Sequence, residues 1–320
     1  MRLLRAALGS AQTEAKKRPR ALDLCFSIDH EALRRAWEAC PVEATDGGLE
    51  PLCAVLEHCL TRPTPLSISH IEAERGQQVL PRVLAYMNHA AEVLSAAVDH
   101  AELAADFGGP MVPGLPWKEC TSAVSLLNLA ARLFAQLAAT PQYRLLLLQH
   151  EVPAILRQSI ARLSDCTQMS INHVGAADGG GSPRATSEGQ LLALLNTLQA
   201  CALLLGCLWQ AGFAVVHAPE ELPLPTLPRL PDSVEELLRT PTATPTAALG
   251  LGHMEADDGG GEHGAQLSGL QAHALLRVLQ LCQPLHRMPS VSVACWSSAA
   301  RVQRLSMAAI SVLLQVSGKW

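Results

Sequence analysis

One uncharged stretch constrains the fold more than any other feature. Between Gln190 and Val216 the chain has no charged side chain, and leucine recurs on every side of the helix that this stretch predicts. Such a helix must be covered by other helices or by lipid, and it is long enough to span a bilayer. Asn196, Gln199 and Gln210 are costly in hydrocarbon, however. We therefore expect the buried central helix of a soluble domain, with a single membrane-spanning helix over residues 190–216 as the alternative.

The amino-acid composition favours helices over sheets. Leucine and alanine dominate the apolar stretches, and only 3% of the 320 residues are aromatic. Domains rich in β-structure depend on valine, isoleucine, threonine and aromatic residues, which are scarce in these stretches. Because 49% of the residues are hydrophobic, the chain is able to bury a sizeable core. We expect a soluble, all-α protein.

Apolar residues at helical spacing, interrupted by proline and glycine, predict a series of helices. Ser187 and Gln190 have the spacing of a capping box and are expected to begin the central helix, which runs through Trp209. Thr140 is expected to cap a short helix that has Pro141 at its first position. The other expected helices cover residues 27–40, 49–60, 81–106, 119–139, 153–163, 268–288 and 292–316.

The chain is expected to have six parts, separated where the composition changes. Segments rich in glycine, serine and aspartate, or in proline, are expected to be flexible or to act as linkers. The parts are a basic tail or targeting segment (1–20), a first helical half (21–164), a flexible insertion (165–187), the central apolar helix (188–217), a low-complexity linker rich in proline and glycine (218–266) and a C-terminal helical pair (267–320).

A proline next to an apolar residue opens an amphipathic helix at three places, over residues 49–52, 79–84 and 152–156. Residues 140–163, where a short helix leads through Val152 and Pro153 into a longer one, resemble the second-to-third helix step of an armadillo repeat. Glu151 stands where that family usually has glycine. The resemblance implies an armadillo-like superhelical stack over residues 21–316, with insertions. An irregular α-helical bundle is the alternative.

Neither catalysis nor cofactor binding is indicated by any motif. The sequence contains no G-x-S-x-G and no phosphate-binding loop with Gly-Lys-Ser/Thr. Cys282 and His286 are four residues apart, but Pro284 lies between them and no partner pair is near, so we expect Cys282 in the core. We expect no enzyme activity, no catalytic, cofactor-binding or metal-binding residues, and no cofactor.

Two groups of histidines and acidic residues are candidate metal sites. The first lies on the polar face of the helix expected at 81–106, and lacks the H-E-x-x-H and E-x-x-H patterns, so we expect a solvated face. The second lies in a glycine-rich loop, where ordering the chain costs roughly 1–2 kcal/mol per residue. The first group is His89, Glu92, Asp99, His100, Glu102 and Asp106, and the second is His253, Glu255, Asp257, Asp258, Glu262 and His263.

Charge and cysteine usage limit the partners and the compartment. A net charge of −5, with no basic helix interleaved with aromatic residues, argues against nucleic acid as a partner. The ten cysteines contain no C-x-x-C pair, which favours a reducing compartment. We expect a cytoplasmic scaffold that binds a protein or peptide in a groove between stacked helices. The basic cluster from Lys16 to Arg20 leaves the nucleus open, and the N-terminal residues 1–15 leave an organelle open.

Overall fold

The computed structural model describes residues 40–41, 43–61, 79–107, 115–139, 141–176, 184–218, 260–288 and 291–316. Every regular element in these ranges is a helix, so the expected all-α class is confirmed. The helices are α3 (Asp46–Thr61), α5 (Val79–Phe107), α6 (Trp117–Leu137), α7 (Pro141–Gln149), α8 (Val152–Ala176), α9 (Arg184–Trp209), α10 (Phe213–His217), α12 (Gly260–Leu285) and α13 (Val293–Val316).

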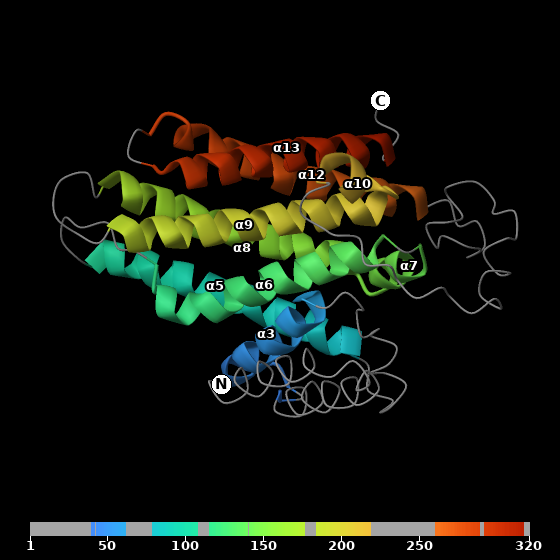
Figure 1. Ribbon diagram of the computed structural model, residues 1–320, viewed down its shortest axis with the longest axis horizontal. Helices are drawn as coiled ribbons and strands as arrows, with labels where there is room; N and C mark the ends of the chain where they lie inside the picture. Colours follow the sequence, from blue (N-terminus) through green and yellow to red (C-terminus); the bar gives the residue numbers. More distant parts are fainter. Residues whose placement is uncertain are drawn as a thin grey trace, which may run out of the picture.

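The long helices lie in two layers. In one layer α3 packs against α6, α6 against α9, and α9 against α13; in the other, α5 packs against α8 and α8 against α12. The layers meet where α5 contacts α6, α8 contacts α9, and α12 contacts α13. Figure 1 shows the resulting order across the molecule, from α3 at the bottom to α13 at the top. We call the layer of α3, α6, α9 and α13 the front layer.

Helix α9 is the centre of this arrangement, because it packs against α6, α8 and α13. Its leucines are buried except for Leu192, which is partly buried, as the uncharged stretch predicted. Among the described helices, α9 and α6 are long and apolar enough to cross a membrane; 78% of the apolar window of α9 and 67% of that of α6 are buried by the rest of the protein. A helix that is apolar on all sides is suited either to a helical core or to a lipid bilayer, and in this structure α9 lies in a helical core.

The turn between α7 and α8 ends at Glu151, a position that suits glycine. Glu151 has a φ of 56°, a left-handed conformation that glycine adopts without strain and other residues rarely adopt. Its carbonyl accepts the backbone N–H of Ala154 at 2.9 Å and so begins α8. The backbone at this position therefore favours glycine, although the sequence has glutamate there.

The prediction of a flexible insertion at 165–187 is largely wrong. Helix α8 does not end near residue 163 but continues to Ala176, and α9 begins at Arg184; residues 177–183 lie outside the described ranges. Ser164 and Thr167 in this part of α8 are buried, and each donates a hydrogen bond to a carbonyl one turn earlier, at 2.7 and 2.6 Å. This pairing removes the cost of burying their hydroxyl groups.

Three helix starts also differ from expectation. Ser187 lies inside α9 and does not cap it, since the helix begins three residues earlier. Pro51 lies inside α3, which begins at Asp46. Helix α12 begins at Gly260 and so includes the end of the expected linker. The start of α13 agrees with expectation, because Ser292 precedes the helix and its hydroxyl oxygen accepts the N–H of Cys295 at 3.5 Å.

Several predicted features lie outside the described residues. They are the basic tail (1–20), residues 27–39 of the helix expected at 27–40, the proline-rich segment from residue 219 and the loop group from His253 to Asp258.

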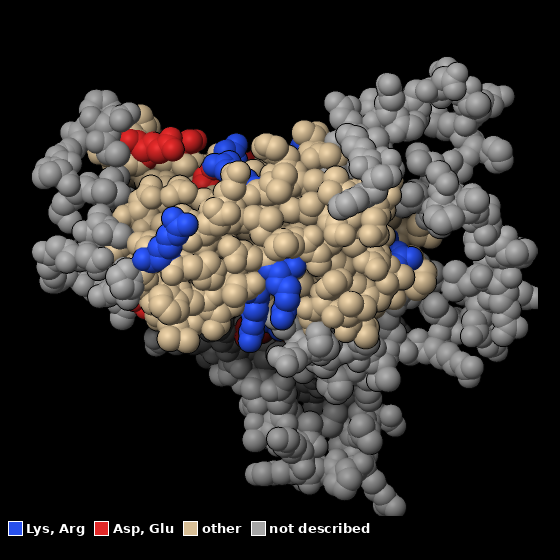
Figure 2. Space-filling view, turned by 90° about the horizontal axis from the view of Figure 1, so that it is seen from above, with Lys and Arg blue, Asp and Glu red and all other residues tan. Residues whose placement is uncertain are grey.

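The surface at the α12–α13 end carries few charges. In Figure 2, which views the molecule from this end, most described atoms belong to neither acidic nor basic residues, and two basic side chains lie together near the middle. Exposed apolar side chains on these two helices include Leu270, Leu276, Val293 and Met307. Because charged groups are sparse on this surface, a single arginine has a large effect on its local charge.

Candidate functional site

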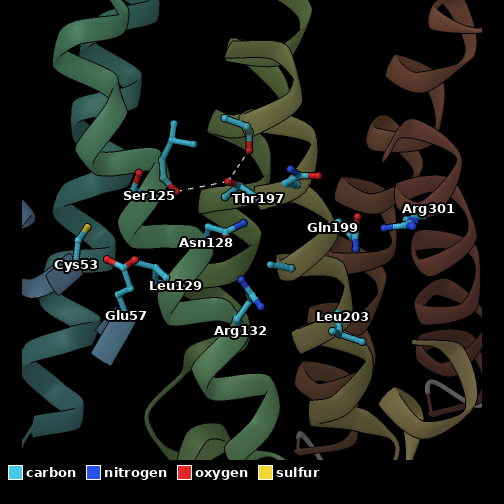
Figure 3. Close-up of a pocket in the computed structure, with 14 residues that line it drawn as sticks. Cys53, Glu57, Ser125, Asn128, Leu129, Arg132, Thr197, Gln199, Leu203 and Arg301 are labelled. Carbon is cyan, nitrogen blue, oxygen red and sulfur yellow. Dashed lines mark hydrogen bonds between the residues drawn. The ribbon is translucent and has the colours of Figure 1, made fainter. Parts of the chain in front are cut away.

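A groove with a volume of about 650 Å³ crosses the front layer. Its lining comes from four helices that are far apart in the sequence, α3, α6, α9 and α13, and Figure 3 shows their side chains converging on it. The lining residues are Cys53, Glu57, Val124, Ser125, Asn128, Leu129, Arg132, Ala193, Asn196, Thr197, Gln199, Ala200, Leu203 and Arg301.

Helical spacing puts these residues on one face of each helix. On α6, Ser125, Asn128 and Arg132 follow one another at three- and four-residue intervals and face the groove, while the other faces of α6 are buried. On α9, Ala193 and Ala200 are two turns apart and form part of the floor. Because alanine side chains are short, they leave a hollow that leucine would fill.

Hydrogen bonds hold the four walls in register. Between α3 and α6, the thiol of Cys53 lies 3.6 Å from the Ser122 carbonyl. Thr197 of α9 donates to the Ala193 carbonyl at 2.8 Å, and its oxygen lies 3.5 Å from the Val124 carbonyl of α6. Ser298 of α13 donates to Oδ1 of Asn196 at 2.8 Å. The groove is thus part of the folded structure before any ligand arrives.

The polar groups of the groove are mainly amides and guanidinium groups. Asn128, Asn196 and Gln199 supply amides, each with N–H donors and a carbonyl acceptor. Arg132 and Arg301 are exposed, as is Glu57 at the α3 side. The apolar side chains of Leu129 and Leu203 lie between these polar groups. The groove therefore offers hydrogen bonds and apolar contacts side by side.

The groups considered for catalysis or metal binding are engaged in packing or face solvent. His89 lies 2.9 Å from Asp46 and pairs α5 with α3, while Glu92, Asp99 and Glu102 are exposed, as expected of a polar face. Cys282 is buried, as expected, and His286 bonds with Gln303 at 3.0 Å. In the part of the chain that the structure describes, no three His, Cys, Asp or Glu side chains form a group fit to hold a metal.

The buried thiols are poor nucleophiles. Burial raises the pKa of Cys166, Cys201, Cys207 and Cys282 to about 12, and Cys120 reaches about 11 for the same main reason. A thiol reacts as its thiolate, so these groups are inert near neutral pH. They behave as small apolar side chains, as the sequence indicated.

The sequence pattern predicts no site residue and does not indicate this groove. In the sequence, Asn196 and Gln199 stand out only as polar interruptions of an apolar helix. The groove lining depends on the order in which α3, α6, α9 and α13 pack. A usable signal did exist in Asn128, Arg132 and Asn196, which are polar residues on helices whose surroundings are apolar.

Comparisons with protein-family models, with curated proteins and with solved structures found no significant match for this chain.

Proposed function

We propose that this protein is a non-enzymatic interaction scaffold, and that the front-layer groove binds an extended peptide segment of a partner protein. The observation that carries the proposal is the continuous groove lined by four stacked helices. Neighbouring helices pack about 8–10 Å apart, so crossing from α3 to α13 covers roughly 27 Å. An extended chain advances about 3.3 Å per residue, so about eight residues would fit.

The chemistry of the lining supports a binding role. Asparagine and glutamine side chains pair with both the N–H and the C=O of a peptide backbone. Because Asn196 already accepts a hydrogen bond from Ser298, its amide N–H groups remain directed to other partners. Amides and guanidinium groups are poor general acids and bases near neutral pH. They suit recognition better than proton transfer.

The armadillo-like stack is our proposal for the finer architecture. Support comes from the succession of a short α7, a longer α8 and the apolar α9, with α7 contacting α6, α8 and α9. The layered packing, in which each helix touches mainly its neighbours along the molecule, also favours a stack over a closed bundle. In this proposal the front layer presents the binding surface.

Peptide selection tests the proposed function. A display library of random decapeptides would be panned against the full chain, against Asn128→Trp, which places a large side chain in the groove, and against Gln158→Trp on exposed α8 surface. We expect peptides that bind the parent and Gln158→Trp but lose at least tenfold in affinity for Asn128→Trp. Equal binding to both tryptophan variants, or no enrichment on the parent, would rule the groove out. Circular dichroism checks that both variants fold.

A membrane anchor at residues 190–216 is the second candidate. It is favoured by the length and apolar composition of α9, and of α6 beside it. The extensive burial of α9 among α6, α8 and α13 favours the scaffold, since a lipid-facing helix would be less covered by protein. Alkaline carbonate extraction of cells expressing the chain separates the two. We expect full release into the soluble fraction, and retention in the membrane pellet would support the anchor.

A further inference from the structure

Charge is distributed unevenly along the groove. Glu57 reaches from α3 toward α6, Arg132 lies between α6 and α9, and Arg301 points from α13 toward Gln199 (Figure 3). Helix α13 has no acidic residue, and the single acidic residues of α6 and α9, Glu119 and Glu188, do not line the groove. The groove lining therefore has a carboxylate at its α3 end and guanidinium groups from its middle to its α13 end.

Arg132 differs from Arg277 and Arg82, whose guanidinium groups are already paired within the described part of the protein. Arg277 forms an ion pair with Asp165, and Arg82 donates to the carbonyls of Cys40 and Pro41. Arg132 has no hydrogen bond or ion pair with any described residue, although its side chain lines the groove and is exposed. A guanidinium group in that position is available to a carboxylate from outside, which it is able to hold through two parallel hydrogen bonds.

We infer that the groove selects an acidic peptide segment, with an aspartate or glutamate side chain bound at Arg132 and the acidic part of the peptide directed toward Arg301. This inference rests on the proposed function, because it names the partner chemistry of the same groove. Glu57 repels an acidic residue at the α3 end and attracts a lysine or arginine there. The charges thus set the direction in which the peptide crosses the helices.

The inference favours a peptide over a nucleic acid. No aromatic side chain lines the groove, so bases would have no surface on which to stack. A net charge of −5 also repels a polyanion, and a short peptide with one or two carboxylates suffers less from that repulsion. Attraction to acidic peptides must therefore come from local pairing at the groove.

The same decapeptide library gives a sharp test when it is panned against Arg132→Glu and against Arg157→Glu. Both variants change the net charge equally, but Arg157 is on α8, in the other layer, and does not line the groove. We expect peptides selected on the parent and on Arg157→Glu to be enriched several-fold in aspartate and glutamate. Peptides selected on Arg132→Glu should lose this preference and gain lysine or arginine at the corresponding position.

Affinity measurements complete the test. For the best acidic peptide, fluorescence anisotropy should show binding weakened about three- to tenfold by Arg132→Gln and unchanged by Arg157→Gln. Groove-dependent peptides without an acidic preference, or a preference that Arg132→Glu leaves unchanged, would overturn this inference and leave the proposed function standing. Peptides that bind Asn128→Trp as well as they bind Gln158→Trp would rule out both this inference and the proposed function.

Discussion

Tyr86 joins α5 to the segment that precedes α3. Its side chain is fully buried, and its hydroxyl oxygen lies 3.0 Å from the carbonyl oxygens of both Pro41 and Glu43. A Cβ atom added to Gly48 would overlap the Tyr86 hydroxyl group, whereas one added to Gly47 would meet nothing within 4 Å. The lack of a side chain at Gly48 is thus what lets Tyr86 reach its partners.

Gly48→Ala should therefore destabilise the protein, and Gly47→Ala should not. Moving the hydroxyl of a buried tyrosine strains the packing and breaks a hydrogen bond, which together cost about 2 kcal/mol. At Gly47, alanine reduces the freedom of the unfolded chain and should be neutral or stabilising by up to about 1 kcal/mol. Urea unfolding followed by circular dichroism measures both changes. Equal stabilities for the two variants would show that Tyr86 moves aside without cost.

The buried thiols make stability sensitive to alkaline pH. In the unfolded chain a cysteine ionises near its reference pKa of 9.0, while in the folded protein burial keeps Cys201 and Cys207 protonated to about 12. Between these values the unfolded state binds fewer protons than the folded state, so the free energy of unfolding falls as pH rises. Below pH 9 this contribution to stability is fully present.

We expect the double variant Cys201→Ala, Cys207→Ala to lose less stability than the parent between pH 8 and pH 10. Each removed thiol should reduce the loss by about 1 kcal/mol. Urea unfolding at the two pH values measures the difference, and the variant's own stability at pH 8 corrects for the lost packing. Identical pH dependence in parent and variant would contradict the proposed burial of these thiols.

At the scale of elements, the position of α9 decides how the protein tolerates charge. Leu198 is 1% exposed, and Asn196, two residues earlier, is exposed at the groove. Leu198→Asp would bury an unpaired carboxylate, at a cost of several kcal/mol against a typical total stability of about 5–15 kcal/mol. The Leu198→Asp variant should then melt far below the parent.

Asn196→Asp is the matched control, because it puts the same carboxylate on the same helix but in solvent. Its oxygen is still able to accept the Ser298 hydrogen bond, so we expect a change within about 0.5 kcal/mol. Circular-dichroism melts compare the two variants. A Leu198→Asp variant that melts like the parent would show that α9 is not in the core.

Helices with a strong apolar pattern were predictable, and helices stabilised by polar pairing were not. The expected helices at 81–106, 119–139 and 292–316 correspond to α5, α6 and α13, because their apolar stripes are sufficient evidence of a buried face. The second half of α8 was missed because Ser164 and Thr167 look like loop residues until their bonds to the preceding turn are known. The groove was missed because it depends on which helices pack together, and periodicity along one helix contains no such information.

At the scale of the whole molecule, packing between neighbours along the stack predicts uneven stability. Each helix of the front layer contacts its neighbours in that layer, and α6, α9 and α13 each also pack on a helix of the other layer, so α9 is supported from both sides, while α3 and α13 lie at the two ends. In such arrays stability is approximately a sum of local terms and interface terms. The ends should open at a lower free energy than the middle.

Hydrogen exchange followed by mass spectrometry tests this prediction, with Leu305→Ala as the perturbation. Leu305 is fully buried on α13, and its truncation should cost about 2–5 kcal/mol. If the stack opens locally, exchange should accelerate strongly in α13 and in α12, less in α9, and least in α3 at the opposite end. The amides of α9 should be the slowest to exchange in the parent. A closed bundle that unfolds as one unit would instead show the same acceleration in α3 as in α13, because every slow amide would then exchange through global unfolding.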